Sequence, residues 1–465
     1  MQMDAGTQQT TNGQVSFWYA GQGLPEPRPA LDGDISADVV IVGAGYTGLW
    51  TAYYLKKAQP RLRIVVLESR FAGFGASGRN GGWLTNSITG GRGQYVKDHG
   101  RALVGRFQTL LNETVDEVIA VAEAERIDAA IVKGGELNVA RNPAQLRRLQ
   151  SWAAGEAHWP EAGTTLLSAS ESRARVNIAG TLGAIHHPHC ARIHPARLAR
   201  GLAAAVERSG VRIYEDTTVT EITTGRAITD RGNVDAAYIV RATEGFTANL
   251  KGSHREWLPM NSSMIVTEPL SDGVWSEIGW EQFDTVSDMA HAYMYAQRTS
   301  DNRIALGGRG VPYRYGSRTD TDGATQPETI AQLAGILRGM FPAAAGAHID
   351  HAWSGVLGVP RDWKATVGLD LKSGIGWAGG YVGTGVAASN LAGRTLRDLI
   401  LHPGSELTAM PWVNRRVRQW EPEPLRWIAV KALYRAYAAA DKAESNGRKT
   451  TSPIATAADL VSGRR

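Results

Sequence analysis

Val39-Val40-Ile41-Val42-Gly43-Ala44-Gly45-Tyr46-Thr47-Gly48 is the stretch that decides the fold. Its four leading apolar, mostly β-branched residues predict a buried parallel strand, and the glycine turn after them opens a helical pattern that runs to Lys57. A second apolar strand, 64–67, ends at Glu68, which lies 20 residues after Gly48. Strand, G-x-G-x-x-G turn, helix, strand and acid in this order indicate a dinucleotide-binding unit.

Each residue of the turn has a physical role. Gly43 permits the tight turn, Gly45 lets a pyrophosphate approach bare backbone, and Gly48 lets helix and strand pack closely. The helix start offers unpaired N–H groups and a positive dipole end to phosphates. Glu68 accepts hydrogen bonds from a ribose 2′-hydroxyl and repels a 2′-phosphate, which disfavours NADP. The cofactor-binding residues predicted here are Gly43, Ala44, Gly45, Tyr46, Thr47, Gly48, Glu68 and Ser69.

A second loop of small residues, 71–82, follows the acid and favours FAD over NAD. It lets the extended half of a larger cofactor lie along bare backbone, which a nicotinamide enzyme has no evident need for. Ser77, Arg79 and Asn80 supply hydrogen-bond donors, and Trp83 is predicted to stand beside the flavin. The residues predicted to bind FAD here are Gly75, Ala76, Ser77, Gly78, Arg79, Asn80, Gly81, Gly82, Trp83 and Leu84.

A third glycine cluster, 379–389, precedes another helical pattern. A helix N-terminus aimed at the flavin pyrimidine ring would stabilise negative charge on the reduced flavin. By itself the cluster is also compatible with an ordinary glycine-rich helix entry. The remaining predicted cofactor residues are Val219, Gly245, Gly355, Gly383, Thr384, Gly385 and Val386.

Over residues 30–405 the sequence resembles the FAD-dependent amine and amino-acid oxidase superfamily, which includes glycine, sarcosine and D-amino acid oxidases. Within it, the sequence is most similar to the gamma-glutamylputrescine oxidoreductase branch. The most specific shared segment is Ala76-Ser77-Gly78-Arg79-Asn80-Gly81-Gly82. The other segments that carry the resemblance are 38–48 with Glu68, Ile193-His194-Pro195, 304–309, Trp353-Ser354-Gly355 and 380–385.

The resemblance implies an α/β fold in which a Rossmann-like FAD-binding domain is interleaved with an antiparallel-sheet substrate domain, followed by a C-terminal helical extension. The predicted ranges are an N-terminal leader at 1–30, an FAD-binding domain at 31–90, 191–250 and 351–403, a substrate domain at 91–190 and 251–350, and a helical extension with a mobile tail at 404–465. Within the leader, residues 1–14 are expected to be disordered, and the tail after Arg448 is expected to be mobile. Apolar residues at three- and four-residue spacing predict a helix over 101–127, and Pro195 marks the start of a predicted helix over 195–208.

Noncovalent FAD is the predicted cofactor. Some relatives attach FAD through a Cys before the last glycine cluster, and residues 353–379 contain none; others use a His just after the second loop, and residues 75–90 contain none. His186, His187, His189 and Cys190 fall within five residues, which is too compressed for a tetrahedral zinc site. We therefore predict no metal.

Composition excludes several classes of protein. The 50 basic and 45 acidic residues give a formal net charge of +5 and are scattered, which does not favour a nucleic-acid partner. A single cysteine excludes intrachain disulfides and disulfide-reductase chemistry.

With no signal pattern at the N-terminus and no apolar run of about 18 residues, a cytoplasmic protein is expected. The amphipathic stretch 425–442 could lie on an anionic membrane, but docking on its own domain or on a second subunit is favoured.

The resemblance implies that an amine passes a hydride from its α-carbon to flavin N5, that the imine then hydrolyses, and that oxygen accepts the electrons to give peroxide. The expected substrate is a primary or secondary amine: an amino acid, an N-acylated polyamine or an N-methyl amine. Tyr295, which alternates with His291 and Tyr293, and Arg309 at a strand end are predicted to position it. The alternatives are a dehydrogenase that serves a carrier or quinone, and a non-catalytic scaffold stabilised by FAD.

Overall fold

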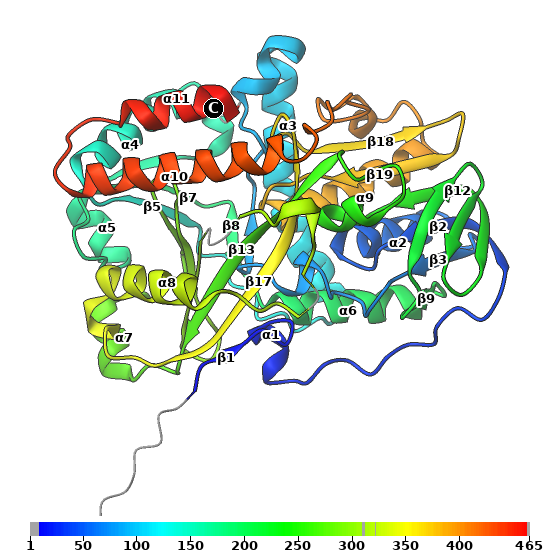
Figure 1. The fold of residues 1–465 in the computed structure, drawn as a ribbon, viewed down its shortest axis with the longest axis horizontal. Coiled ribbons are helices and arrows are strands. Elements are labelled where there is room, and N and C mark those ends of the chain that lie inside the picture. Colours follow the sequence, from blue (N-terminus) through cyan, green and yellow to red (C-terminus); the bar gives the residue numbers. More distant parts are fainter. Residues whose placement is uncertain (1–8, 309–311, 321, 463–465) are drawn as a thin grey trace, which may run out of the picture.

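The computed structural model describes residues 9–308, 312–320 and 322–462. Two sheets lie side by side, with the parallel sheet on the right of Figure 1 and the larger, mostly antiparallel sheet at its centre and left. The predicted fold, an α/β chain with a second sheet and C-terminal helices, is confirmed.

The strand predicted first, β2 (Ile35–Val42), lies at the centre of the parallel sheet. Strand β2 pairs in parallel with β3 (Ile64–Leu67) on one side and with β12 (Asn233–Arg241) on the other. The outer strands are β9 (Arg212–Tyr214) beside β3, β19 (Ile375–Gly379) and the hairpin β10 (Val219–Thr223) and β11 (Arg226–Thr229) beside β12, and β18 (Thr366–Asp370) beside β19.

Helices α2 (Tyr46–Ala58) and α9 (Gly385–Leu401) pack on this sheet and against one another. Their contact is close because Gly393 has no side chain: a Cβ there would lie 2.8 Å from the backbone of Trp50 and Thr51. The same core takes in α3 (Gly93–Ala124) and α6 (Pro195–Arg208) through fully buried residues such as Val115 and Leu202.

The larger sheet runs in the order β1-β17-β13-β16-β15-β14-β5-β7-β6. Its strands are β1 (Thr11–Asn12), β5 (Glu136–Ala140), β6 (Thr165–Ser168), β7 (Gly183–His187), β13 (Trp257–Thr267), β14 (Thr285–Asp288), β15 (Tyr295–Arg298), β16 (Ile304–Gly308) and β17 (Ile349–Pro360). A separate two-stranded ribbon joins β4 (Trp83–Thr85) to β8 (Cys190–Arg192). The remaining helices before the C-terminal part are α1 (Phe17–Ala20), α4 (Pro143–Glu156), α5 (Ala169–Arg175), α7 (Asp272–Ile278) and α8 (Pro327–Met340).

Three expectations about the organisation of the chain need correction. The expectation of disorder is wrong for the described part of 1–14, because β1 pairs with β17. Farther along the predicted leader, Trp18 and Tyr19 are buried, so residues 17–20 pack on the core. Helix α3 begins at Gly93 rather than 101, with a kink at Gly100, whose φ of 76° suits glycine. The predicted boundary between 350 and 351 cuts through β17, which belongs to the larger sheet. The rest of the domain division stays a prediction.

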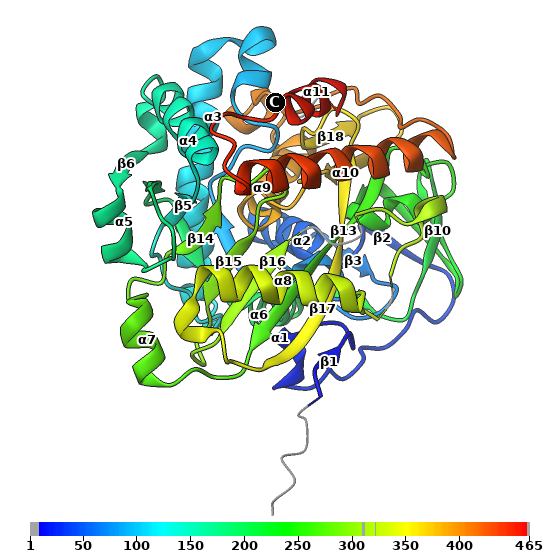
Figure 2. The same ribbon diagram turned by 60° about the vertical axis from the view of Figure 1, so that its left-hand side comes forward.

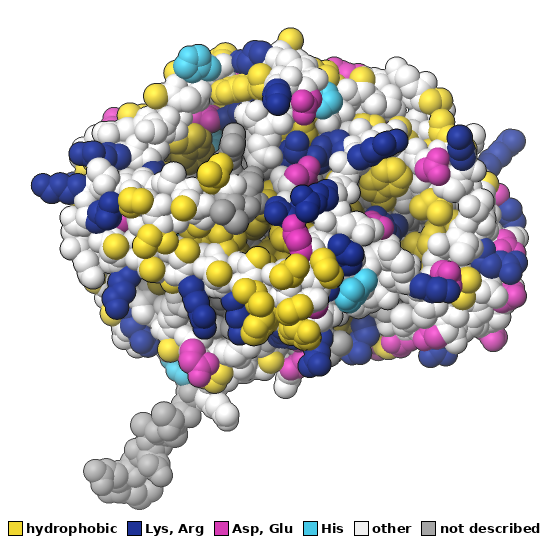
Figure 3. Space-filling model, turned by 45° about the horizontal axis from the view of Figure 1, so that its top comes forward, with side chains coloured by type: hydrophobic (Ala, Val, Ile, Leu, Met, Phe, Trp, Pro, Cys, Tyr) yellow, Lys and Arg dark blue, Asp and Glu magenta, His cyan; other side chains and the backbone are white. Residues whose placement is uncertain are grey.

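The C-terminal part forms two helices. Helix α10 (Leu425–Ser445) covers the predicted amphipathic stretch 425–442, and α11 (Pro453–Ser462) lies where a mobile tail was expected. Figures 1 and 2 both place them together on one side of the larger sheet, near α4. The outer face of α10 exposes Ile428 among basic residues such as Lys431, and Figure 3 shows hydrophobic and basic side chains interspersed over this side of the molecule. Across the described ranges, no helix is long and apolar enough to cross a bilayer.

Candidate active site

The first glycine loop adopts the geometry that its sequence demands. Gly43 has a φ of 104°, and a Cβ at Gly48 would lie 1.9 Å from the Gly43 carbonyl oxygen. Gly45 precedes the first residue of α2, and the backbone N–H of Tyr46 donates to Ser77 Oγ at 2.8 Å. The first and second glycine loops therefore meet at the N-terminus of α2.

Glu68 closes the loop from the end of β3. Its carboxylate accepts hydrogen bonds from the backbone N–H groups of Ala44, at 2.8 Å, and Arg70, at 3.1 Å. Desolvation raises the pKa of Glu68, while these N–H donors act in the opposite direction. The acid at the end of the second strand is thus held beside the turn, where the motif predicts it.

A cavity of about 190 Å³ lies along these loops. It is lined by residues from the ends of β2, β3 and β12, from both glycine loops and from the N-terminus of α9, and these include glycines as well as aromatic side chains such as Phe74 and Tyr381. The predicted cofactor residues that line it are Gly43, Gly45, Tyr46, Thr47, Glu68, Ser69, Gly75, Ala76, Ser77, Asn80, Val219, Gly383, Gly385 and Val386. A Cβ at Gly383 would meet nothing within 4 Å, so this backbone faces open space in the cavity.

A second cavity, of about 450 Å³, adjoins the first. The two share Ala76, Asn80, Leu357, Gly383 and Val386 as lining residues, so these residues separate or border both cavities. The predicted residues found only along the larger cavity are Arg79, Gly81, Trp83, Tyr295, Gly355 and Thr384. Adjoining cavities beside two helix N-termini and two glycine loops fit a long dinucleotide cofactor.

Six predicted cofactor residues line neither cavity, and the glycines among them lie where a side chain would clash. Gly78 is one example, because a Cβ there would lie 2.3 Å from the Gly73 carbonyl oxygen. Gly245 is another, because its Cβ would lie 2.7 Å from Val356. The full set is Ala44, Gly48, Gly78, Gly82, Leu84 and Gly245.

The polar side chains of the second loop are used within the protein. The buried Arg79 guanidinium forms an ion pair with Asp320 at 3.0 Å, donates to the Phe74 carbonyl at 2.8 Å and lies over the Phe74 ring. Asn80 donates to the Ala76 and Ser77 carbonyls. These contacts hold the loop in shape, and the role of the same side chains as donors to FAD stays a prediction.

Tyr295, which was predicted to position the substrate, lines the larger cavity and packs between two glycines. A Cβ at Gly81 or at Gly307 would come within 2.6 or 2.3 Å of its ring. Its hydroxyl lies 2.8 Å from Ser262 Oγ, and its ring meets that of Trp83 edge to face at 6.1 Å. Trp83 Nε1 is buried without a hydrogen-bond partner among the described residues. Arg309 lies outside the described residues.

Sequence reasoning missed Glu244, which follows β12 and lines the smaller cavity. Its carboxylate accepts hydrogen bonds from the backbone N–H groups of Gly358, Gly380 and Tyr381, and so joins three segments. Desolvation raises the pKa of Glu244 to about 7. Its φ of 44° is unusual for a residue other than glycine. The only signal for Glu244 in the sequence was that it directly precedes Gly245, which was predicted to bind the cofactor.

Sequence reasoning also missed Glu136, Tyr437 and Asp459 as lining residues of the larger cavity. Glu136 accepts hydrogen bonds from Thr85 and Asn138, and it pairs with His187 at 3.2 Å. Tyr437 and Asp459 reach the same cavity from α10 and α11. No motif marks these residues, because they come from distant parts of the chain.

The histidine cluster at 186–190 is divided among different partners. His187 faces Glu136, whereas His186 lies 3.3 Å from Asp284. Cys190 is fully buried 3.2 Å from Thr285 Oγ1, and burial raises the pKa of its thiol. These side chains therefore do not converge on one point.

The chain belongs to the family of FAD-dependent oxidoreductases, since residues 38–399 match the family model described as DAO, FAD dependent oxidoreductase. As a member, it is an FAD-dependent oxidoreductase that acts on amines or amino acids. Gamma-glutamylputrescine oxidoreductase of Escherichia coli (strain K12) is 31% identical over 391 residues, which cover 83% of this chain and 88% of that protein.

Two further relatives agree with this assignment. Sarcosine oxidase subunit beta of Rhodobacter capsulatus is 23% identical over 402 residues, covering 82% of this chain and 89% of that protein. The crystal structure of glycine oxidase from Geobacillus kaustophilus superposes with a TM-score of 0.68 at 22% identity, covering 82% of this chain and 99% of that one. The second likeness shows the fold.

Proposed function

We propose that the protein binds FAD noncovalently and oxidises a primary or secondary amine to an imine, with oxygen as the electron acceptor. The observation that carries the proposal is the pair of adjoining cavities, of which the narrow part lies along the glycine loops and the wide part is aromatic and polar. Such a pair of cavities suits a dinucleotide in one and a small substrate in the other.

The residues of the narrow part would hold the cofactor. The N-terminus of α2 at Gly45 and Tyr46 would receive the pyrophosphate, and Glu68 would accept hydrogen bonds from the ribose hydroxyls. The N-terminus of α9 at Gly385 would face the flavin and stabilise negative charge on it. When bound, FAD supplies a hydride acceptor at N5.

The residues of the wide part would orient the amine and lower its pKa. Trp83, Tyr293 and Tyr295 give this part aromatic walls that exclude water, and desolvation favours the neutral amine that can lose a hydride. The resulting imine takes up water to give a carbonyl compound and an amine or ammonia, and oxygen would accept the two electrons and two protons to give hydrogen peroxide. Among possible substrates, an N-acylated polyamine is supported by the 31% identity to gamma-glutamylputrescine oxidoreductase.

An anaerobic screen of amines for loss of the flavin absorption bands tests this proposal. We expect bleaching by at least one amine, followed by oxygen uptake and peroxide release on admission of air. Bleaching without peroxide would instead identify a dehydrogenase, and no bleaching by any amine would contradict the proposal. Acid precipitation should release the yellow colour into the supernatant, and colour that stays with the pellet would contradict noncovalent attachment.

Arg309 remains a proposed substrate residue on sequence grounds. If the substrate carries a carboxylate, Arg309→Lys should raise KM and leave the flavin content unchanged, because a lysine cannot form the bidentate contact. Normal flavin content with normal kinetics would remove Arg309 from the site.

The cytoplasmic location also stays a prediction.

A further inference from the structure

One side of the larger cavity is formed by a row of polar side chains on the larger sheet. Asn138 of β5 lies opposite Ser287 of β14, which in turn lies opposite Tyr295 of β15. All three line the cavity, and the Tyr295 hydroxyl continues the row to Ser262 of β13. Because side chains alternate along a strand, Glu136 lies on the same face of β5 as Asn138, and it lines the cavity as well. The row therefore begins with a carboxylate.

Three polar groups hold the Glu136 carboxylate in place. Its Oε2 accepts a hydrogen bond from the Thr85 hydroxyl at 2.8 Å, and its Oε1 accepts one from the Asn138 amide at 3.0 Å. His187 Nε2 lies 3.2 Å from Oε2, because the two residues are directly opposed in the pairing of β5 with β7. Donors on both oxygens favour the ionised form of Glu136, which is only 8% exposed.

His187 is placed to donate to this carboxylate as a neutral ring. Its Nδ1 is buried and has no hydrogen-bond partner among the residues that the structure describes. A doubly protonated ring would put an N–H donor at this atom, and a buried donor without an acceptor is unfavourable. The geometry therefore favours the neutral ring with its proton on Nε2, which leaves the negative charge of Glu136 unbalanced.

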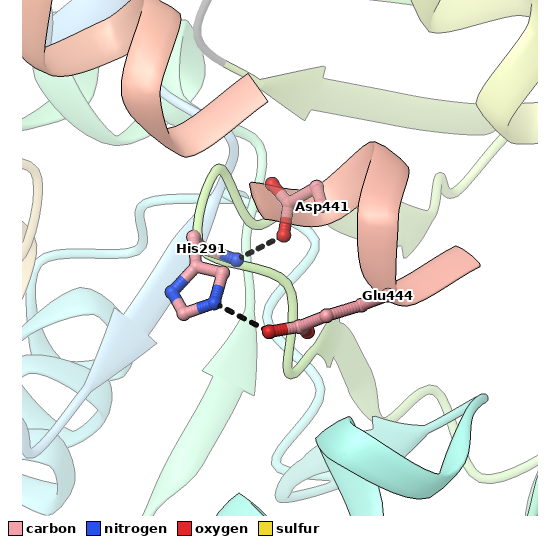
Figure 4. Close-up of side chains that lie close together, drawn as sticks. All are labelled: His291, Asp441 and Glu444. Carbon is pink, nitrogen blue, oxygen red and sulfur yellow. Dashed lines mark hydrogen bonds and ion pairs between the residues drawn. The ribbon is translucent and has the colours of Figure 1, made fainter. Parts of the chain in front are cut away.

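The basic residues that line the same cavity are engaged elsewhere. Arg79 forms an ion pair with Asp320 at 3.0 Å. Arg148 of α4 forms an ion pair with Glu444 at 2.8 Å, and His291 Nε2 lies 3.0 Å from the same carboxylate (Figure 4). These side chains are held by other acids, so they do not neutralise the carboxylate on β5.

Glu136 also differs from the other acids that line the cavity. Asp459 accepts the hydroxyl proton of Tyr437, and Asp288 accepts two backbone N–H groups of the loop that follows it. Glu136 lies within a strand, and within the described ranges it forms no ion pair with a Lys or Arg. Its Oε1 accepts only from Asn138, so a lone-pair site remains on this oxygen.

We propose that Glu136 determines substrate specificity by binding a second cationic group of the substrate, an ammonium or a guanidinium that is not the amine to be oxidised. The nitrogen that reacts must be neutral, whereas an ionised carboxylate stabilises the charged form of a nitrogen beside it. The nitrogen at Glu136 therefore stays charged while another nitrogen of the same molecule reacts. The inference rests on the proposed amine-oxidising function and adds the class of amine that the site prefers.

The test compares α,ω-diamines with n-alkylamines of equal chain length on the full-length holoenzyme. We expect the wild type to favour the diamine in kcat/KM. Glu136→Gln should lose about tenfold of that preference through KM and keep its flavin content, because an amide carries no charge. Glu156→Gln is the matched control, since Glu156 is 9% exposed and lines neither cavity.

A second variant separates binding of the substrate from support of the fold. Glu136→Asp keeps the charge but withdraws it by one methylene, so the best diamine should become one methylene longer. A general loss of structure would not move the best chain length. If Glu136→Gln does not fold, this variant decides: a longer best diamine supports the inference, and an unchanged best length overturns it.

The remaining outcomes separate the inference from the proposed function. A wild type that does not favour diamines, unchanged preference in Glu136→Gln, or an equal loss for both kinds of amine would overturn the inference and leave that function standing. If no amine bleaches the flavin, the function fails, and calorimetric titration with the same diamines decides. Weaker binding to Glu136→Gln than to the wild type supports the inference, whereas equal binding, or no binding to either, overturns it.

Discussion

Gly45 and Gly48 belong to one motif, but alanine at each should affect a different property. Gly48→Ala should lower the stability of the fold, whereas Gly45→Ala should lower the affinity for FAD. A Cβ at Gly48 would lie 1.9 Å from the Gly43 carbonyl oxygen and 3.1 Å from Ile41 Cγ2. Since contacts under 3.0 Å are essentially never seen, α2 would have to move from β2 by about 1 Å. Overpacking of this kind costs ~1–3 kcal/mol or more, so we expect Gly48→Ala to lose about 3 kcal/mol of stability.

At Gly45 the nearest atom to an added Cβ is Ser77 Oγ at 3.0 Å, which is the end of a short side chain. The φ of −80° also suits alanine, so the fold should lose no more than about 1 kcal/mol. The methyl group would stand where the pyrophosphate is proposed to pass. We therefore expect FAD affinity to fall about 100-fold, which corresponds to about 2.7 kcal/mol.

Urea unfolding without added FAD and fluorescence titration with FAD measure the two effects separately. Gly335→Ala is the control, because Gly335 is exposed within α8 with nothing within 4 Å of its Cβ position, and alanine there should stabilise by ~0.5–1 kcal/mol. Wild-type FAD affinity in Gly45→Ala would refute the assignment of the phosphate site. Wild-type stability in Gly48→Ala would refute the packing argument.

Two further predictions concern stability. Desolvation lowers the pKa of His194 to about 4 from an ordinary value of 6.5, so the folded state binds the proton less readily and stability is lost as the pH falls from about 6.5 toward 4. His194→Asn keeps an acceptor for the Arg197 N–H at the start of α6. In urea titrations it should remove up to about 3 kcal/mol of that pH dependence. A free energy of unfolding that depends on pH as in the wild type would contradict this. Asp320→Asn should cost about 3 kcal/mol in the same assay, because it leaves the buried Arg79 charge without its carboxylate, while Arg314→Gln, 3.8 Å from Asp320, should cost little.

The cofactor end of the molecule could be predicted because its signals are local. The turn at 43–48, its flanking strands and the helix after it all lie within residues 35–67, so their pattern is complete within one stretch. The helix over 195–208 was also predicted with its observed bounds, since Pro195 marks its first turn.

The substrate end could not be predicted in the same way. Periodicity over 425–442 indicated a helix, but its docking depends on His291 and Glu444, which are 153 residues apart in sequence. The Arg79 ion pair spans 241 residues, and Glu244 meets Tyr381 across 137. Such contacts leave no periodic trace, so neither the Arg79–Asp320 ion pair nor the hydrogen bonds of Glu244 could be predicted.

The two ends differ because one is built from backbone and the other from side chains. At the narrow end, bare glycines and helix N-termini leave little that a substitution can vary without filling the cavity or breaking the turn. At the wide end, side chains from β5, α4, β15 and the two C-terminal helices line the proposed substrate space, and of these Tyr295 packs directly on Gly81 of the second glycine loop. Substitutions of residues at the wide end that do not contact the glycine loops should therefore change which amine is accepted and leave the flavin content constant, whereas alanine at Gly45 should lower the flavin content.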